Sequence, residues 1–136
     1  MRKINVTDIV LPVLSLALTL GVAFGFQPCA AHEDGSWMTC HWAGQAVLGV
    51  GAALSALNLL RFALSAKARK GLDLGVIALA LLAALLPGRL ISLCMMRTMR
   101  CRSVMQPAVL VIAVLITLAA AADMLLQAKN ERKAEA

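Results

Sequence analysis

The sequence predicts an all-α protein, a four-transmembrane-helix bundle with both termini cytoplasmic and two extracytoplasmic loops rich in Cys, Met and His. The first observation is composition: 61% of the 136 residues are hydrophobic and 15% are charged, whereas a soluble domain carries about 25% charged residues. The second is the presence of four long apolar runs, each close to the roughly 20 residues that a membrane-crossing helix needs. This composition excludes a soluble enzyme, a disordered chain and a secreted disulfide scaffold.

The four predicted spans lie at about residues 9–26, 43–64, 72–93 and 107–127, and residues 128–136 form a short polar cytoplasmic tail. Together they make a single membrane domain over residues 1–136. Because lipid satisfies no backbone group, each span must be a helix or a strand of a closed barrel. None of the runs alternates apolar and polar residues as barrel strands do. The first run is longer than the apolar part of a signal peptide, so we expect it to be retained.

Positive charge predicts the orientation of these spans. Nine Lys and Arg residues lie on the side of the N-terminus, the middle loop and the C-terminal tail, and four lie on the opposite side: Arg89, Arg97, Arg100 and Arg102. The side with more basic residues faces the cytoplasm. Because the basic residues flank apolar runs and form no water-exposed basic face, the expected partner is the lipid bilayer and not nucleic acid.

Four charged residues lie within about two turns of the predicted inner ends of the helices: Asp8, Arg61, Asp73 and Asp123. The favoured interpretation is helix-end electrostatics for the acids and a side chain of Arg61 that reaches the inner headgroups. The alternative is a proton or ion relay, although such residues usually lie nearer the middle of the membrane.

Small residues spaced four apart are candidates for helix packing. They are Gly21 and Gly25 in the first span and Gly51 and Ser55 in the second. Such spacing lets helix backbones approach closely. The contact formed is either within the bundle or with another subunit in a homo-oligomer, and the sequence leaves both open.

All four cysteines, Cys29, Cys40, Cys94 and Cys101, fall in or next to the predicted outer loops. Extracytoplasmic cysteines in even number favour disulfides, which would hold the two loops, with the pairing open. A helix running through both Cys94 and Cys101 would separate their sulfurs by about 10 Å. A disulfide between them therefore requires a break in the helix, because it needs Cα atoms within about 7 Å.

Two other chemistries use the same cysteines. Paired cysteines on two outer loops of four helices are similar to the quinone-linked membrane thiol–disulfide oxidoreductases, although this chain has no Cys-x-x-Cys. Thiolate, thioether and imidazole groups together also suit copper, and a copper or haem site would draw further ligands from Met38, His41, Met95 and Met99. The leading hypothesis is nevertheless a non-enzymatic subunit whose outer cluster is held by disulfides.

A series of spaced residues resembles a family of small bacterial four-span membrane proteins of unknown function. The most distinctive part is the Met-x-Cys-His-Trp element at residues 38–42. The remaining matching residues are Phe26, Pro28, Cys29, Pro87, Leu90, Ile91, Cys94, Met95, Met99, Cys101, Arg102 and Pro107. The resemblance implies a location in the bacterial inner membrane and an accessory role beside a transport protein such as an ABC-type permease.

Overall fold

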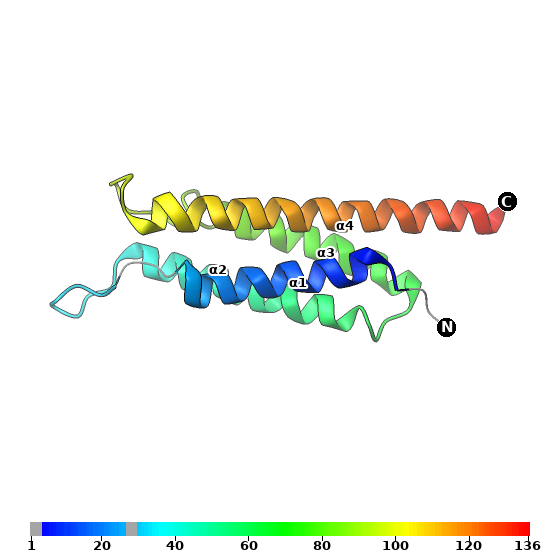
Figure 1. Cartoon of the computed structure of the whole chain (residues 1–136), viewed down its shortest axis with the longest axis horizontal. Coiled ribbons are helices and arrows are strands. Elements are labelled where there is room, and N and C mark those ends of the chain that lie inside the picture. The colour runs from blue at the N-terminus through cyan, green and yellow to red at the C-terminus, as the bar shows by residue number, and fades with distance from the viewer. Residues whose placement is uncertain (1–3, 27–29) are drawn as a thin grey trace.

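The computed structural model describes residues 4–26 and 30–136, which form a bundle of four antiparallel helices. Helix α1 (Val6–Leu20) continues into a π-helical turn, η1 (Gly21–Gly25), and is followed by α2 (Thr39–Leu60) and α3 (Ala66–Leu85). A second π-helical turn, η2 (Cys101–Met105), leads into α4 (Gln106–Glu135). The start of α1, the end of α4 and the α2–α3 connection share one end of the bundle (Figure 1). The predicted all-helical fold class is confirmed.

Three of the helical segments are long and apolar enough to cross a membrane: Val6–Gly25, Thr39–Leu60 and Cys101–Glu135. Helix α3 is more polar because its first two turns carry Lys67, Arg69, Lys70 and Asp73. It also ends at Leu85, so the segment predicted to span residues 72–93 is helical only in part. Pro87 follows two residues later and has no backbone N–H with which to continue a helix.

The four helices enclose one apolar core. Each helix contacts two neighbours, in the order α1, α2, α3, α4 and back to α1. Buried side chains recur at spacings of three and four residues, the pattern of helices that pack at a small crossing angle. Examples are Leu11 and Leu18 in α1, Val47 and Leu54 in α2, Val76, Ala80 and Ala83 in α3, and Val109 and Ile116 in α4.

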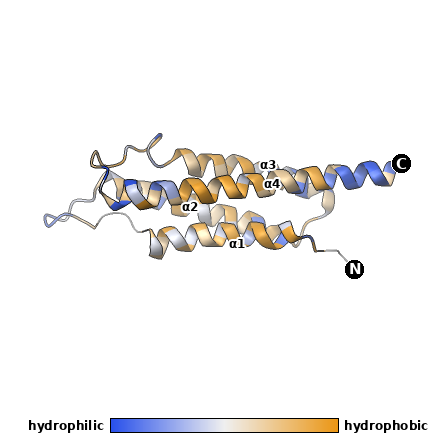
Figure 2. Ribbon diagram, turned by 45° about the horizontal axis from the view of Figure 1, so that its top comes forward, coloured by the Kyte–Doolittle hydropathy of each residue, from blue (hydrophilic) through white to orange (hydrophobic). Residues whose placement is uncertain are grey.

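The outward faces of the helices are apolar as well. Large hydrophobic side chains are exposed on every helix, among them Val13, Leu59, Leu81 and Leu118. Figure 2 shows this apolar middle zone and the hydrophilic last turns of α4 beyond it. A helix that is apolar on both its inner and outer faces belongs in lipid, so the structure supports a small membrane protein.

Helices α1 and α2 approach closely at two of the small residues singled out in the sequence. A Cβ atom added to Gly51 would lie 2.8 Å from the hydroxyl oxygen of Thr19. The hydroxyl of Ser55 lies 3.3 Å from the same oxygen and donates a hydrogen bond to the carbonyl of Gly51. Gly51 and Ser55 therefore lie at the α1–α2 contact within the bundle.

The two glycines of α1's GxxxG sequence lie elsewhere. A Cβ atom on Gly21 would lie 2.7 Å from the ring of Phe26, and one on Gly25 would have no described atom within 4 Å. Both belong to η1, where the wider π-helical turn changes the face that each residue presents. The turn η1 contacts α2, and a role of Gly21 and Gly25 in helix packing stays a prediction.

Replacing Gly51 by Val is expected to lower the free energy of unfolding in detergent by about 1–3 kcal/mol, because the added carbons overpack the contact with Thr19. The matched control is Gly49→Val on the same helix, since a Cβ atom at Gly49 has no described atom within 4 Å. Thermal unfolding followed by circular dichroism measures both variants. Equal losses would show that the close contact does not limit stability.

Candidate functional site

Three cysteines from distant parts of the chain meet at the end of the bundle opposite the termini. Cys40 lies in the first turn of α2, Cys101 begins η2, and both are buried. Cys94 lies in the α3–α4 connection and is half-buried. Their three Sγ atoms lie within 4.8 Å of one another. We call Cys40, Cys94, Cys101 and the adjacent Met38 the sulfur cluster.

Contacts within the sulfur cluster are non-covalent. The Sγ atoms of Cys40 and Cys94 are 3.5 Å apart, and Cys94 Sγ lies 3.9 Å from the Sδ of Met38. A disulfide has an S–S distance of about 2.05 Å. No disulfide joins Cys40, Cys94 and Cys101 to one another, so the expected disulfide links among these three are absent. Cys29, and any pairing with it, lies outside the described residues.

The early end of α3 brings Cys94 to the other two cysteines. Beyond Pro87 the chain folds back, and the N–H groups of Leu90 and Ile91 donate to the carbonyls of Leu85 and Leu86 at 3.1 and 3.0 Å. A break in the helix was predicted as the condition for the Cys94 and Cys101 sulfurs to approach. The structure contains this break.

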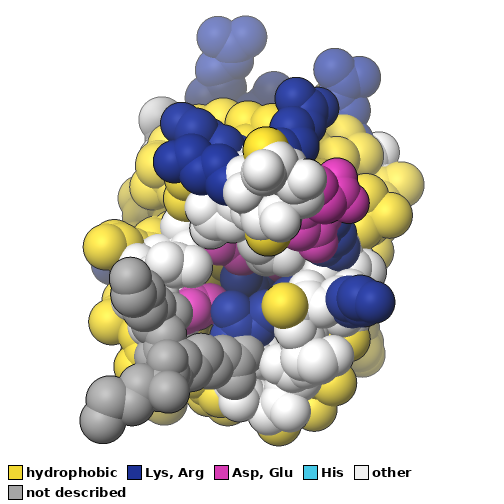
Figure 3. Space-filling view, turned by 90° about the vertical axis from the view of Figure 1, so that its right-hand side faces the viewer, with side chains coloured by type: hydrophobic (Ala, Val, Ile, Leu, Met, Phe, Trp, Pro, Cys, Tyr) yellow, Lys and Arg dark blue, Asp and Glu magenta, His cyan; other side chains and the backbone are white. Residues whose placement is uncertain are grey.

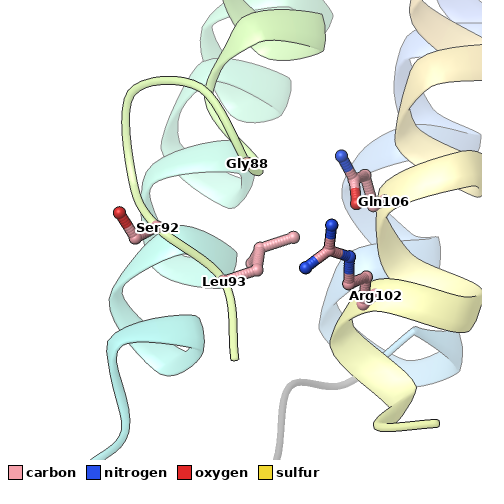
Figure 4. Close-up of a pocket in the computed structure, with 5 residues that line it drawn as sticks. All are labelled: Gly88, Ser92, Leu93, Arg102 and Gln106. Atoms are coloured by element: carbon pink, nitrogen blue, oxygen red, sulfur yellow. The ribbon is translucent and has the colours of Figure 1, made fainter. Parts of the chain in front are cut away.

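A small pocket lies at the same end of the bundle as the sulfur cluster (Figure 4). In the close-up, the guanidinium group of Arg102, from η2, points toward Leu93 on the α3–α4 connection, and Gln106 lies beside it at the start of α4. Leu93 and Arg102 are direct chain neighbours of two of the clustered cysteines. The full lining is Gly88, Ser92, Leu93, Arg102 and Gln106. The pocket is therefore polar and carries a positive charge from Arg102.

The imidazole of His41 belongs to an aromatic stack and not to the sulfur cluster. Its ring centroid lies 4.0 Å from that of Trp37 in a stacked arrangement and 5.7 Å from that of Trp42, edge to face. The group of potential metal ligands contains only the three cysteine sulfurs among the described His, Cys, Asp and Glu residues.

Of the methionines expected as ligands, the structure places one beside the cysteines. Met38 contacts Cys94, whereas the side chain of Met95 is 96% exposed. Met99 is partly buried, and its carbonyl accepts hydrogen bonds from the N–H groups of Arg102 and Ser103, both at 3.0 Å.

The η1–α2 connection contains a local turn that carries the acidic residue Asp34. Its carboxylate accepts hydrogen bonds from the hydroxyl and backbone N–H of Ser36 at 2.8 and 3.1 Å. These hydrogen bonds stabilise the ionised form and lower the pKa of Asp34. Asp34 is an exposed loop residue and takes no part in the sulfur cluster.

At the opposite end of the bundle, Arg61 connects α2 to the other three helices. Its guanidinium group donates hydrogen bonds to Asp73 of α3 and Asp123 of α4. The carboxylate of Asp8 in α1 lies 3.6 Å away. Only 1% of the Arg61 side chain is exposed, so these ion pairs lie inside the bundle. We call Asp8, Arg61, Arg69, Asp73 and Asp123 the buried ionic network.

Further polar groups complete the buried ionic network. Arg69 donates to Asp8 at 3.2 Å and to the backbone carbonyl of Arg61 at 3.2 Å. The amide of Gln127 donates to Asp73 at 3.0 Å and to Asp123 at 2.8 Å. Thr7 donates to Asp123 at 2.6 Å. Figure 3 shows basic and acidic side chains gathered on this end face, some of them in its recess.

A comparison with protein-family models matches residues 11–126 to a domain of unknown function, DUF4418. The chain belongs to this family. The match includes all four cysteines and every residue of the buried ionic network except Asp8, so the family's domain contains most of both sites. Comparisons with curated proteins and with solved structures found no match.

The buried ionic network is the feature that sequence reasoning missed. Arg61 was expected to extend toward the lipid headgroups, and this expectation is wrong because the side chain turns into the bundle. A signal was present in the sequence: each of the four predicted helices has one of these charged residues near its inner end, at similar depth. Charged side chains at one depth on neighbouring helices can pair with one another, and pairing is the usual fate of intramembrane charges.

Replacing Arg61 by Gln is expected to lower the free energy of unfolding by about 3–5 kcal/mol, because it leaves buried carboxylates without their cation. The control is Lys70→Gln, which breaks an ion pair with Glu131 on the exposed surface of the same end. That change should cost no more than about 1 kcal/mol. Chemical unfolding in detergent measures both, and similar small losses would mean that Arg61 is not held in the network.

Proposed function

We propose that the chain is a small, non-enzymatic integral membrane protein whose sulfur cluster binds a soft metal ion, copper(I), on the outer face of a bacterial inner membrane. The observation that carries the proposal is the approach of three cysteine Sγ atoms to within 4.8 Å of one another. These atoms come from three separate segments, so the fold itself assembles the ligand set.

The donor chemistry favours copper(I) over zinc. Thiolate and thioether ligands select soft ions such as copper(I), and the thioether of Met38 contacts Cys94. Structural zinc sites are almost always four-coordinate, with cysteine or histidine ligands. The nearest imidazole in the sequence, that of His41, stacks on Trp37 and contacts Trp42 edge to face.

A fourth span for α3 and cytoplasmic termini are part of this proposal. The polar start of α3 is compatible with a membrane because its Arg69 and Asp73 are buried in ion pairs. Its outward side chains Leu74, Leu81 and Leu85 are apolar and at least half exposed, as lipid contact requires. The excess of basic residues at the end that carries both termini supports placing this end in the cytoplasm.

The partner we propose is a membrane transport protein, such as the ABC-type permease implied by the family resemblance. Cys40 and Cys101 are buried, so a large thiol substrate has little access to their sulfur atoms. Their burial therefore favours a protein that binds an ion over an enzyme that exchanges disulfides with such a substrate. The exposed Met95 and Met96 provide soft sulfur atoms through which an ion can pass between the sulfur cluster and a partner.

We expect the purified protein to bind one copper(I) ion per chain. Replacing Cys40, Cys94 or Cys101 by Ser should each weaken binding more than about 10-fold, because each removes a thiolate ligand. His41→Ala and Met95→Leu are matched controls and should leave the affinity unchanged. Competition against a copper(I) chelator, with metal analysis of the same sample, gives the affinity and stoichiometry. Unchanged binding in all three Ser variants would contradict the proposal.

The second candidate function is thiol–disulfide exchange, favoured by the 3.5 Å contact between Cys40 and Cys94. Forming a bond between these sulfurs releases two protons and transfers two electrons to an acceptor, for which a quinone is the proposed class. The third thiol, Cys101, is close enough to attack such a disulfide.

Repeated turnover distinguishes the two candidates. An oxidoreductase should form a Cys40–Cys94 disulfide, lose it to mild thiol reductant and re-form it when a quinone is added. Non-reducing peptide mass spectrometry detects the bond, and Cys94→Ser is the control that prevents it. A quinone-dependent cycle without bound metal would favour the second candidate, whereas metal binding without such a cycle favours the first.

A further inference from the structure

The buried ionic network has unequal numbers of acids and bases. Asp8, Asp73 and Asp123 supply three carboxyl groups, and Arg61 and Arg69 supply two guanidinium groups. All five residues are at most 8% exposed. With every group ionised, the described part of the network would carry a net charge of −1. An uncompensated charge in a buried site is strongly unfavourable, so the described residues of the network are short of one positive charge when every group is ionised.

Hydrogen bonding distinguishes the three carboxyl groups. Asp123 accepts from Thr7, Arg61 and Gln127, and such donors stabilise an ionised carboxylate. Asp8 accepts from the two nitrogen donors Arg69 Nη1 and the backbone N–H of residue 5. It also has a second guanidinium, that of Arg61, 3.6 Å away.

Of the three carboxyl groups, that of Asp73 is the one whose ionised form is least stabilised by its surroundings. It is 0% exposed and accepts from Arg61 and Gln127, both of which it shares with Asp123. Two carboxyl groups held on the same donors repel each other when both are ionised, and one then retains a proton.

Hydrogen bonding at this end of the bundle is incomplete among the described residues. The side-chain oxygens of Asn58 and Gln127 are buried acceptors without a described donor. The Nε of Arg69 is likewise a buried donor without a described acceptor. Buried polar groups that lack a partner are unfavourable, so the polar groups here are not fully satisfied by one another.

We propose that the buried ionic network is a binding site for one proton, held by the carboxyl group of Asp73. The proton brings the net charge of the described network to zero. The groups connected to Asp73 through the network are Thr7 and Asp8 from α1, Arg61 at the end of α2, Arg69 from α3, and Asp123 and Gln127 from α4. Helix packing at this end of the bundle then depends on protonation.

The expected pH dependence follows from proton counting. In the unfolded chain Asp73 ionises in the ordinary aspartate range, near pH 4. The folded protein therefore binds one more proton than the unfolded chain above that range, and its stability falls as pH rises until the folded site also loses its proton. Over that interval the unfolding equilibrium constant should increase up to about 10-fold per pH unit.

The test compares the full-length wild-type protein with Asp73→Asn, whose amide stays neutral at every pH. We expect this variant to lose the pH-dependent increase in unfolding. Both proteins contain the same histidines, so the histidine contribution to the pH dependence is the same in each. Infrared spectra at neutral pH should show the carbonyl band of a protonated carboxylic acid in the wild type and not in the variant. The infrared measurement on the wild type alone suffices if Asp73→Asn does not fold.

Two results would overturn the proposal. The first is a wild-type spectrum without a protonated-acid band at any pH at which the protein is folded. The second is stability that depends on sodium, compared with choline at equal ionic strength, and that loses this dependence in Asp73→Asn. That outcome would show that a metal cation supplies the missing charge in place of a proton.

Discussion

The ion pairs of the Arg61 guanidinium group connect all four helices. It extends from the end of α2, contacts carboxylates on α3 and α4, and lies close to one on α1. In lipid, apolar side chains gain little by leaving one helix surface for another, so packing depends on close contacts and polar interactions. Ionic contacts at one depth therefore fix which helices are neighbours and how they are aligned along the bundle axis.

The same helices carry the sulfur cluster at their other ends. Helix α2 has Cys40 in its first turn and is followed directly by Arg61, and the η2–α4 segment begins at Cys101 and contains Asp123. Between the two sites the core is apolar apart from small polar contacts, such as those of Ser15 with Asn58 and Thr19 with Ser55. A mostly apolar core thus separates the sulfur cluster from the buried ionic network.

Much of the fold was predictable because apolar length and helical spacing reflect backbone and lipid physics directly. The convergence of the cysteines also followed from topology, since the first and second predicted outer loops must lie at the same end of an antiparallel bundle. The early end of α3 was harder to predict, because the apolar run continues past Pro87 and hides the break.

Side-chain direction was the main feature that the sequence did not determine. A long side chain at a helix end, such as that of Arg61, can reach either the lipid headgroups or the bundle interior. Its direction depends on where the three carboxylates on the other helices lie, and the sequence does not give their positions. Likewise, the sequence does not determine that the ring of His41 stacks on that of Trp37. The π-helical turn that contains Gly21 and Gly25 was not predicted either.

The most direct test of the central claim, that Arg61 acts by balancing buried carboxylates, measures Arg61→Gln in two backgrounds. In the wild type it removes a needed positive charge and should lower the free energy of unfolding. In the Asp73→Asn/Asp123→Asn background the described network carries an excess positive charge, so the same substitution restores neutrality and should raise the free energy of unfolding. A loss of similar size in both backgrounds would contradict the account, because it would mean that Arg61 stabilises the bundle by packing alone.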